Sequence, residues 1–246
     1  MKARSNNSRN NLNYIYGRLP SLNCLNVSRV KNVFLQQNFS DLNLLSAIAN
    51  KGIKPQYVDV ETLNKMSHNG NHQGIIVETF PYEYSSLDEI LNNVSNKKQP
   101  LILILDEIED PHNFGAILRS ADAFGVDGVV IKSKNQVPLN STVAKVSTGA
   151  IEYVKVAQVS NLNNVLKVLK DKGFWIYAAD GSGKEDYQKV NYSGPVALIV
   201  GSEGRGISQL VMKNSDFIIK IPMMGHVNSL NVSVSTGILL SRIRNK

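Results

Sequence analysis

The chain has 246 residues, 42% hydrophobic and 19% charged, and its 27 Lys and Arg exceed its 20 Asp and Glu, for a net charge of +7. This length allows one or two compact domains, and the composition excludes a disordered, collagen-like or disulfide-stapled protein. One cysteine, no secretory leader and no apolar run of the roughly 18 residues that cross a bilayer predict a soluble cytoplasmic protein without membrane contact.

Positive charge is denser in the first third of the chain. Residues 1–82 carry nine Lys and Arg against four Asp and Glu, whereas residues 99–246 carry sixteen against thirteen. Such an excess favours an anionic partner, nucleic acid among others, but does not identify it.

The chain predicts two α/β blocks. Residues 1–13 are expected to be a mobile tail, 14–82 a small domain, 83–98 a polar linker and 99–246 a larger domain. In the first block, apolar runs predict strands over 30–36, 56–60 and 74–79, with a helix over 42–49.

In the second block, strands and helices alternate. Continuous apolar runs predict strands over 101–105, 128–132, 153–156, 174–178, 196–200 and 217–221. Helical spacing predicts helices over 113–124, 162–170, 207–213 and 230–243. This order favours a mostly parallel sheet covered by helices on both faces. Ligands bind beyond the carboxyl ends of such strands, so the loops after Leu105, Val200 and Ile221 are the candidate sites.

The first of these loops is acidic and leads into a helix. Asn113 is placed to cap that helix. Arg119 falls about 160° from the centre of the helix's apolar stripe, taking about 100° per residue. An exposed helical arginine with no specific role is the simplest interpretation, although the helix start suits a phosphate.

The second loop is rich in glycine. Gly201, Gly204 and Gly206 allow a ligand to approach the backbone, but their spacing fits neither the dinucleotide fingerprint nor the Walker loop. Glu203 stands among them, where a ligand would approach. The third loop passes through Gly225 to a helix that begins near Asn228 or Ser229, with more capping residues than one helix needs.

Taken in order, the three loops resemble the motifs of a known enzyme family. The stretches DPHNFGAILRSADAFG (110–125), IVGSEGRGIS (199–208) and IPMMGHVNSLNVSVSTG (221–237) are similar to those of the SpoU-type, trefoil-knotted RNA ribose 2′-O-methyltransferases. The front block is weakly similar to the L30e-like RNA-binding domain of the branch that methylates a guanosine in the peptidyl-transferase region of 23S rRNA. His72-Gln73-Gly74-Ile75 matches that branch.

The resemblance implies a SPOUT domain with a deep trefoil knot, a homodimer, an RNA substrate and S-adenosyl-L-methionine (SAM) as cofactor, with no metal. It implies cofactor binding at Gly201, Ile221 and Leu230. It also implies catalytic or substrate-binding roles for five residues: Asn113, Arg119, Glu203, Ser229 and Asn231. Arginine has a pKa above about 12, so Arg119 is expected to bind the phosphate and the 2′-oxygen rather than act as a free base.

Other interpretations stay open. A tRNA ribose is a rival substrate, a knotted protein that binds RNA without catalysis is a rival function, and the glycine spacing disfavours a dinucleotide-binding oxidoreductase. His68 and His72 are four residues apart but lack a third ligand, so they predict no metal site. Phe174 and Trp175 open a strand and are expected in the core.

Overall fold

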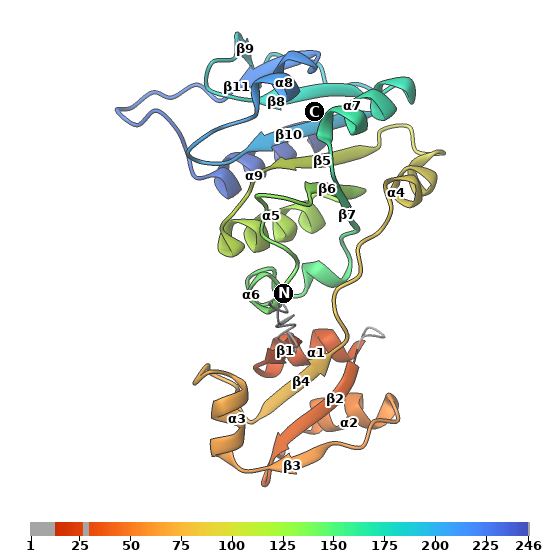
Figure 1. Ribbon diagram of the computed structural model, residues 1–246, viewed down its shortest axis with the longest axis vertical. Coiled ribbons are helices and arrows are strands. Elements are labelled where there is room, and N and C mark those ends of the chain that lie inside the picture. The colour runs from red at the N-terminus through yellow and green to blue at the C-terminus, as the bar shows by residue number, and fades with distance from the viewer. Residues whose placement is uncertain (1–12, 27–29, 246) are drawn as a thin grey trace, which may run out of the picture. The chain divides into compact units, whose positions relative to one another are not determined.

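The structure is a computed structural model that describes residues 13–26 and 30–245 (Figure 1). The chain divides into two compact units between Tyr82 and Glu83, and each is described by itself. The tail predicted over residues 1–13 lies almost wholly outside the described residues.

The first unit is a four-stranded sheet with three helices. Its elements are β1 (Asn13–Tyr16), α1 (Arg18–Asn26), β2 (Val30–Gln36), α2 (Leu42–Asn50), β3 (Gln56–Val58), α3 (Val60–Met66) and β4 (Ile75–Thr79). The strand order is β1-β4-β2-β3, with β2 and β3 parallel and the other two pairs antiparallel. Strand β4 is buried along its length, and the caps Asp41 and Asp59 accept the first free amides of α2 and α3.

The second unit is a seven-stranded sheet with helices on both sides. Its elements are α4 (Leu87–Val94), β5 (Leu101–Asp106), α5 (Pro111–Ala123), β6 (Gly128–Lys132), α6 (Ser141–Val146), the 3₁₀ turn η1 (Ala150–Glu152), β7 (Val156–Val159), α7 (Leu162–Asp171), β8 (Trp175–Ala179), β9 (Glu185–Asp186), β10 (Val196–Gly201), α8 (Gln209–Lys213), β11 (Phe217–Lys220) and α9 (Val232–Arg244). The order is β7-β6-β5-β10-β8-β11-β9, and every pairing is parallel, which confirms the predicted fold class. The knot stays a prediction.

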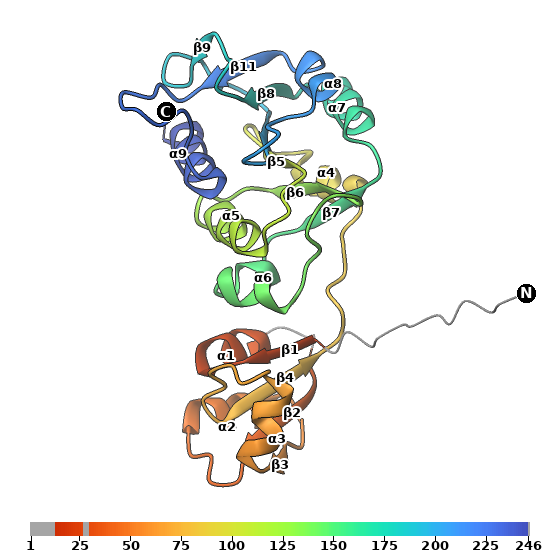
Figure 2. The ribbon, with the colours of Figure 1, turned by 60° about the vertical axis from the view of Figure 1, so that its left-hand side comes forward.

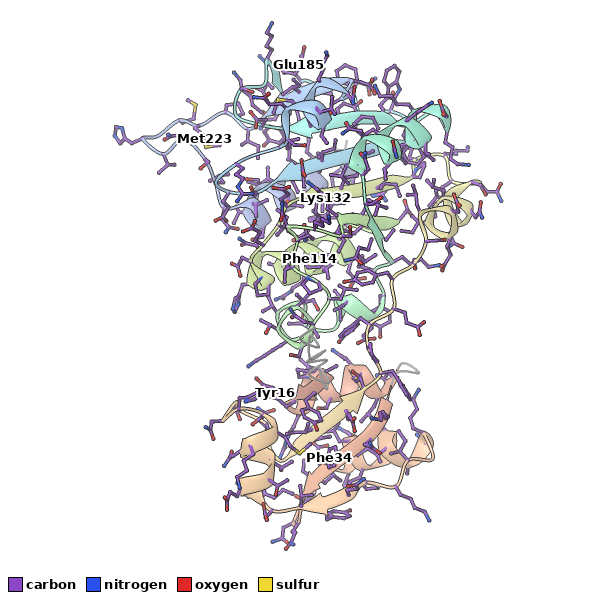
Figure 3. All side chains as sticks on the ribbon, in the orientation of Figure 1. Tyr16, Phe34, Phe114, Lys132, Glu185 and Met223 are labelled. Carbon is purple, nitrogen blue, oxygen red and sulfur yellow. The ribbon has the colours of Figure 1, made fainter. Side chains whose placement is uncertain are left out.

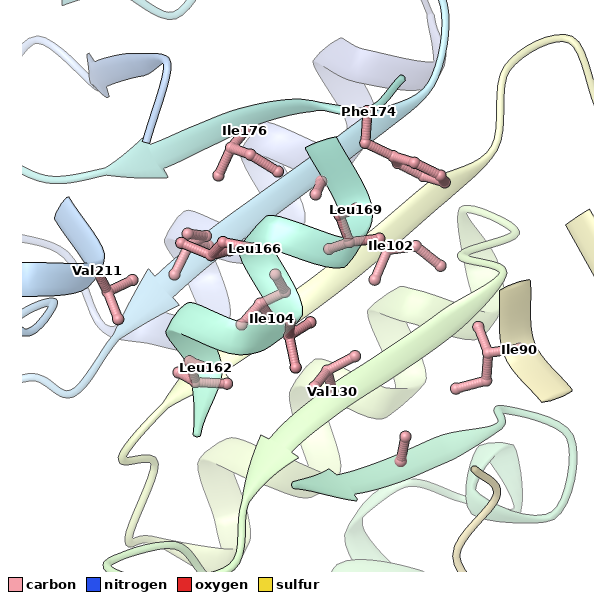
Figure 4. Close-up of a cluster of buried hydrophobic side chains, with 14 of the residues drawn as sticks. Ile90, Ile102, Ile104, Val130, Leu162, Leu166, Leu169, Phe174, Ile176 and Val211 are labelled. Carbon is pink, nitrogen blue, oxygen red and sulfur yellow. The ribbon is translucent and has the colours of Figure 1, made fainter. Parts of the chain in front are cut away.

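The core of this unit lies on both faces of the sheet. In β5 all six residues are buried, and alternate side chains, Ile102 and Ile104, pack with α4, α7 and α8 (Figure 4). Figure 2 shows these helices on one side of the sheet and α5 and α9 on the other. Burial on two faces explains why the strands were visible in the sequence as uninterrupted apolar runs.

The predicted linker is wrong where it crosses α4. Ser86 caps this helix by accepting from Glu89 N at 3.1 Å, and Ile90, Leu91 and Val94 are buried in the core of the second unit. The exposed side of the helix carries Asn92 and Asn93, which belong to the predicted polar linker. This helix of eight residues therefore looked polar in the sequence, because its apolar residues are spaced along one helix face and do not form a run.

Two further expectations need correction. The strand predicted over 153–156 begins only at Val156, because Gly149 adopts a left-handed backbone (φ 98°) and starts η1, which leaves Tyr153 exposed. Trp175 is not in the core but 50% exposed, with its ring against Phe217.

Among the described helices, none is both long and apolar enough to span a bilayer.

Candidate functional site

Five of the eight predicted site residues line one cavity of about 220 Å³ at the carboxyl ends of β8, β10 and β11. They are Gly201, Glu203, Ile221, Ser229 and Leu230. The parallel order explains why segments distant in sequence meet here, since β10 lies between β5 and β8, and β11 lies beside β8. The loop after β11, which includes Met223, projects from this edge (Figure 3).

Three predicted residues form a closed hydrogen-bonded triangle beside the cavity. Asn113 Nδ2 donates to Glu203 Oε1 at 3.0 Å, and Asn231 Nδ2 donates to the same oxygen at 2.6 Å and to Asn113 Oδ1 at 2.9 Å. Val232 N–H also points at Glu203 Oε1, at 3.4 Å. Among the described residues, Glu203 Oε2 has no partner, so one carboxylate oxygen is free for a ligand.

The helix caps explain how Asn113 and Asn231 reach this triangle. Asp110, not Asn113, caps α5 by accepting from His112 N at 2.9 Å, with Pro111 as the first helical residue. The predicted cap is therefore wrong, and its side chain is free to turn toward Glu203. Asn231 itself caps α9, because its Oδ1 accepts from Ser233 N at 2.9 Å. This cap lies two or three residues after the start predicted near Asn228 or Ser229.

Replacing Asn231 by alanine should lower the free energy of unfolding of the second unit by about 2 kcal/mol. About 1 kcal/mol comes from the lost cap and the rest from the two amide hydrogen bonds of the triangle. Asn140, which caps α6 with Oδ1 2.9 Å from Val143 N, is the matched control and should cost about 1 kcal/mol. Urea unfolding followed by the fluorescence of the single tryptophan, Trp175, measures both. Equal losses would contradict an energetic role for the triangle.

Gly201 ends β10 where the chain turns sharply. Gly206 N donates to Ser202 O at 2.9 Å, which folds the following loop back on the strand. A Cβ at Gly201 would overlap the Gly206 carbonyl group and lie 2.5 Å from Ile207 N, so only glycine fits. At Gly204 a Cβ would meet nothing within 4 Å.

Acidic residues at the end of β5 brace this glycine loop. The buried carboxylate of Asp106 accepts from Ser208 N at 2.8 Å. Glu107 accepts from Lys132 Nζ at 2.6 Å and from Arg205 Nη1 at 3.2 Å. Glu107 has a left-handed backbone (φ 64°), a conformation that costs about 1 kcal/mol or more and is kept by these contacts. The hydrogen bond from Lys132 holds the pKa of Glu107 below its ordinary value.

Replacing Glu107 by glutamine should flatten the acid limb of the stability curve. A carboxyl whose pKa is lower in the folded than in the unfolded state stabilises the fold above its ordinary value of 4.5, and that contribution is lost as the pH falls through the folded pKa. Thermal unfolding between pH 6 and about pH 3, followed by Trp175 fluorescence, tests this. A variant whose midpoint falls with pH as steeply as the wild type's would contradict it.

The structure does not bring Arg119 to the cavity. It is exposed on α5, six residues after Asn113 and therefore about 120° around the helix from it. Within residues 13–26 and 30–245 its guanidinium has no hydrogen-bond or ion-pair partner. Within the described residues, Arg119 is thus an unpaired cation on the same helix as Asn113, but on a different face of that helix.

The charged cavity residue that the sequence analysis missed is Asp180. It directly follows β8, and its Oδ1 accepts from Ser182 N at 2.9 Å and from Ser182 Oγ at 2.6 Å. The signal was available, because the rule that selected the other loops applies equally to the segment Ala179-Asp180-Gly181 after a predicted strand.

Comparison with known proteins matches both units. Residues 100–241 match the family model described as "SpoU rRNA Methylase family". Residues 14–85 match the model described as "RNA 2'-O ribose methyltransferase substrate binding".

Individual relatives cover most of the chain. YacO of Bacillus subtilis, named for the TrmH family of tRNA/rRNA methyltransferases, is 46% identical over 197 residues, 80% of this chain and 79% of that protein. The SpoU methyltransferase AviRb of Streptomyces viridochromogenes, solved with its cofactor AdoMet, has a TM-score of 0.79 at 20% identity and covers 99% of this chain and 93% of its own. A TrmH-family structure from Porphyromonas gingivalis has a TM-score of 0.74 at 26% identity, with 96% and 91% covered.

Proposed function

The chain belongs to the SpoU rRNA methylase family, and from this premise we propose that it transfers a methyl group from SAM to the ribose 2′-hydroxyl of a guanosine in 23S rRNA. SAM-dependent methylation of RNA is the family's reaction. The observation that supports it in this chain is the triangle of Asn113, Glu203 and Asn231 at the edge of the cavity.

The lining of the cavity fits SAM. Val200, Ile219 and Leu239 give it apolar walls of the kind that an adenine ring packs against. Asp180 and Glu203 add carboxylates, which suit the ribose hydroxyls and the cationic part of the cofactor. The predicted cofactor residues Gly201, Ile221 and Leu230 belong to the same wall. When bound, SAM supplies a methyl group on a sulfonium, ready for an in-line oxygen nucleophile.

This chain's residues hold and prepare the ribose. A 2′-hydroxyl is a weak nucleophile until its proton is removed or polarised, and fixed positioning supplies several kcal/mol. Ser229, exposed in the loop before α9, is the group that contacts the ribose. Asn231 and Asn113 are positioning residues, because their amides are committed to Glu203 and to each other. The free Oε2 of Glu203 would orient the cofactor or, in a dimer, the guanidinium of Arg119 from a second copy of the chain.

Arg119 binds the phosphate and the 2′-oxygen of the target ribose as the hydroxyl proton leaves. Its place on α5, about 120° from Asn113, favours action at the cavity of a second copy of the chain. The homodimer that the family resemblance implies would provide that copy. The outer faces of α5 and α9 are its candidate surface, because they form a groove of about 830 Å³ with Val234 half exposed.

The choice of 23S rRNA rests on the front unit. Its match to a substrate-binding model and the stretch His72-Gln73-Gly74-Ile75 support the rRNA guanosine branch. A tRNA ribose is the second candidate, because the name of the Bacillus subtilis relative includes both RNAs. Either substrate would place the chain in the cytoplasm.

Incubation with methyl-labelled SAM and unmodified 23S rRNA or tRNA, followed by nucleoside analysis, tests the proposal. The expected product is 2′-O-methylguanosine in 23S rRNA alone. Label in tRNA alone would replace the substrate, and label on a base would overturn the reaction. SAM binding without transfer to either RNA would support the non-catalytic RNA-binding protein.

A further inference from the structure

The first unit has a polar pocket that the methyl-transfer site does not use. It is open to solvent, measures about 690 Å³ and lies where β2 ends and where the segment between α3 and β4 returns to the sheet. We call it the amide pocket, after the four side-chain amides among the residues that define it: Arg18, Gln36, Asn64, Asn71, His72 and Gln73.

A buried histidine fixes the orientation of one amide. Gly74 N–H donates to His72 Nδ1 at 3.0 Å, so this ring nitrogen is an acceptor and the proton of the neutral ring lies on Nε2. Nε2 then donates to Asn64 Oδ1 at 3.1 Å. The oxygen of Asn64 is used, and its NH₂ group is left for a ligand.

A backbone amide fixes a second one. Arg18 N–H donates to Gln73 Oε1 at 2.7 Å, and a backbone N–H can only donate, so the NH₂ group of Gln73 is also left over. Across the described parts of the chain, the side chains of Gln36 and Asn71 have no hydrogen-bond partner. The pocket therefore offers at least two oriented, uncommitted N–H donors and two amides that can adapt.

A guanidinium stands beside these donors. Arg18 lies over the ring of Phe39, 5.8 Å from its centroid, with Nη1 3.4 Å from Asp41 Oδ2. Phe39 in turn packs close to Gly74, where a Cβ would lie 3.1 Å from its ring. The planar cation is thus held in place although its side chain is 56% exposed, and its planar group can stack on a base.

We propose that the amide pocket binds one unpaired base of the RNA substrate, with Arg18 stacked on the base and the NH₂ groups of Asn64 and Gln73 donating to acceptor atoms on its edge. Unpaired bases are read in this way, by stacking and by hydrogen bonds to their edges, whereas duplex RNA hides those edges. The inference rests on the proposed function only in taking RNA as the ligand.

Two variants of the full chain that each add one negative charge test it. Gln73→Glu and Asn64→Asp keep the oxygen that accepts from Arg18 N or His72 Nε2, but replace the NH₂ donors by an anionic oxygen that repels base acceptors. Each should weaken binding of transcribed 23S rRNA by about tenfold or more. Gln56→Glu, exposed on β3 outside the pocket, makes the same charge change and should stay within about twofold. Arg18→Lys, which keeps the charge and loses the plane, should also weaken binding severalfold.

Three outcomes decide the inference. Affinities of Gln73→Glu and Asn64→Asp equal to that of Gln56→Glu would overturn it, as would an equal loss of affinity for a 20-base-pair duplex RNA. An unchanged SAM affinity shows that the second unit is intact in each variant, and unchanged binding of Arg18→Lys would remove the stacking role. If the wild type methylated no ribose, the proposed function would fail while the pattern of RNA affinities could still hold.

Discussion

Replacing Gly201 by alanine should weaken SAM binding by about 100-fold or more. The added methyl group would overlap the Gly206 carbonyl group, which is backbone and cannot rotate away. The loop from 202 to 206 would have to leave the strand, and Glu203 would leave the triangle with it. Isothermal calorimetry with SAM measures the loss.

Gly204→Ala is the matched control for this prediction. Gly204 lies in the same loop, and a Cβ there would meet nothing within 4 Å. This variant should bind SAM as the wild type does. If Gly201→Ala also bound SAM with unchanged affinity while both variants remained folded, the cofactor would occupy another place.

Replacing Arg119 by alanine should reduce methyl transfer by about 10²- to 10³-fold while folding and SAM binding are retained. Alanine is a good helix former, and the exposed side chain of Arg119 has no hydrogen bond or ion pair to lose within the described residues. Arg119→Lys should be poor as well, because a compact ammonium cannot replace the planar pair of donors. Lys167→Ala, an exposed cation on α7, is the control and should transfer methyl groups normally. Undiminished transfer by Arg119→Ala would contradict the assignment.

A mixture of two inactive chains separates action within one chain from action across a dimer. If the proposed homodimer forms, co-expressed Arg119→Ala and Gly201→Ala chains give a mixed dimer in which the intact cavity of the first is paired with the intact arginine of the second. If Arg119 acts across the interface, such mixed dimers should regain up to half of the wild-type activity per dimer. No recovery would place Arg119 and the cavity in the same chain.

The sequence predicted the central strands of the second unit better than helix α4. Strands such as β5 and β10 are buried on both faces, so each can be recognised in the sequence as a run of consecutive apolar residues. Helix α4 buries only three residues on one side, and its polar side dominates any local average. The 3₁₀ turn before β7 depends on the left-handed backbone of Gly149, which spacing alone does not reveal.

The site was predictable to the extent that motif residues lie at strand ends. Glu203 and Asn113 were both singled out, but their contact spans 90 positions in sequence and needs the pairing of β10 with β5. The cap of α5 was misplaced because Asp110 and Asn113 are both good capping residues, and Pro111 decides between them. The orientation of Arg119 relative to the cavity needs the three-dimensional structure.

Asn231 both caps the first turn of α9 and donates hydrogen bonds in the triangle around Glu203. Its side chain therefore couples the site to local unfolding of the C-terminal helix. The backbone N–H groups of Ser233 and Val234 donate to Asn231 Oδ1, so their hydrogens exchange with solvent only when these hydrogen bonds break. Any ligand that holds Glu203 in place therefore slows their exchange, although it touches neither residue. A ligand bound in the cavity should therefore lower the rate of deuterium uptake at the start of α9.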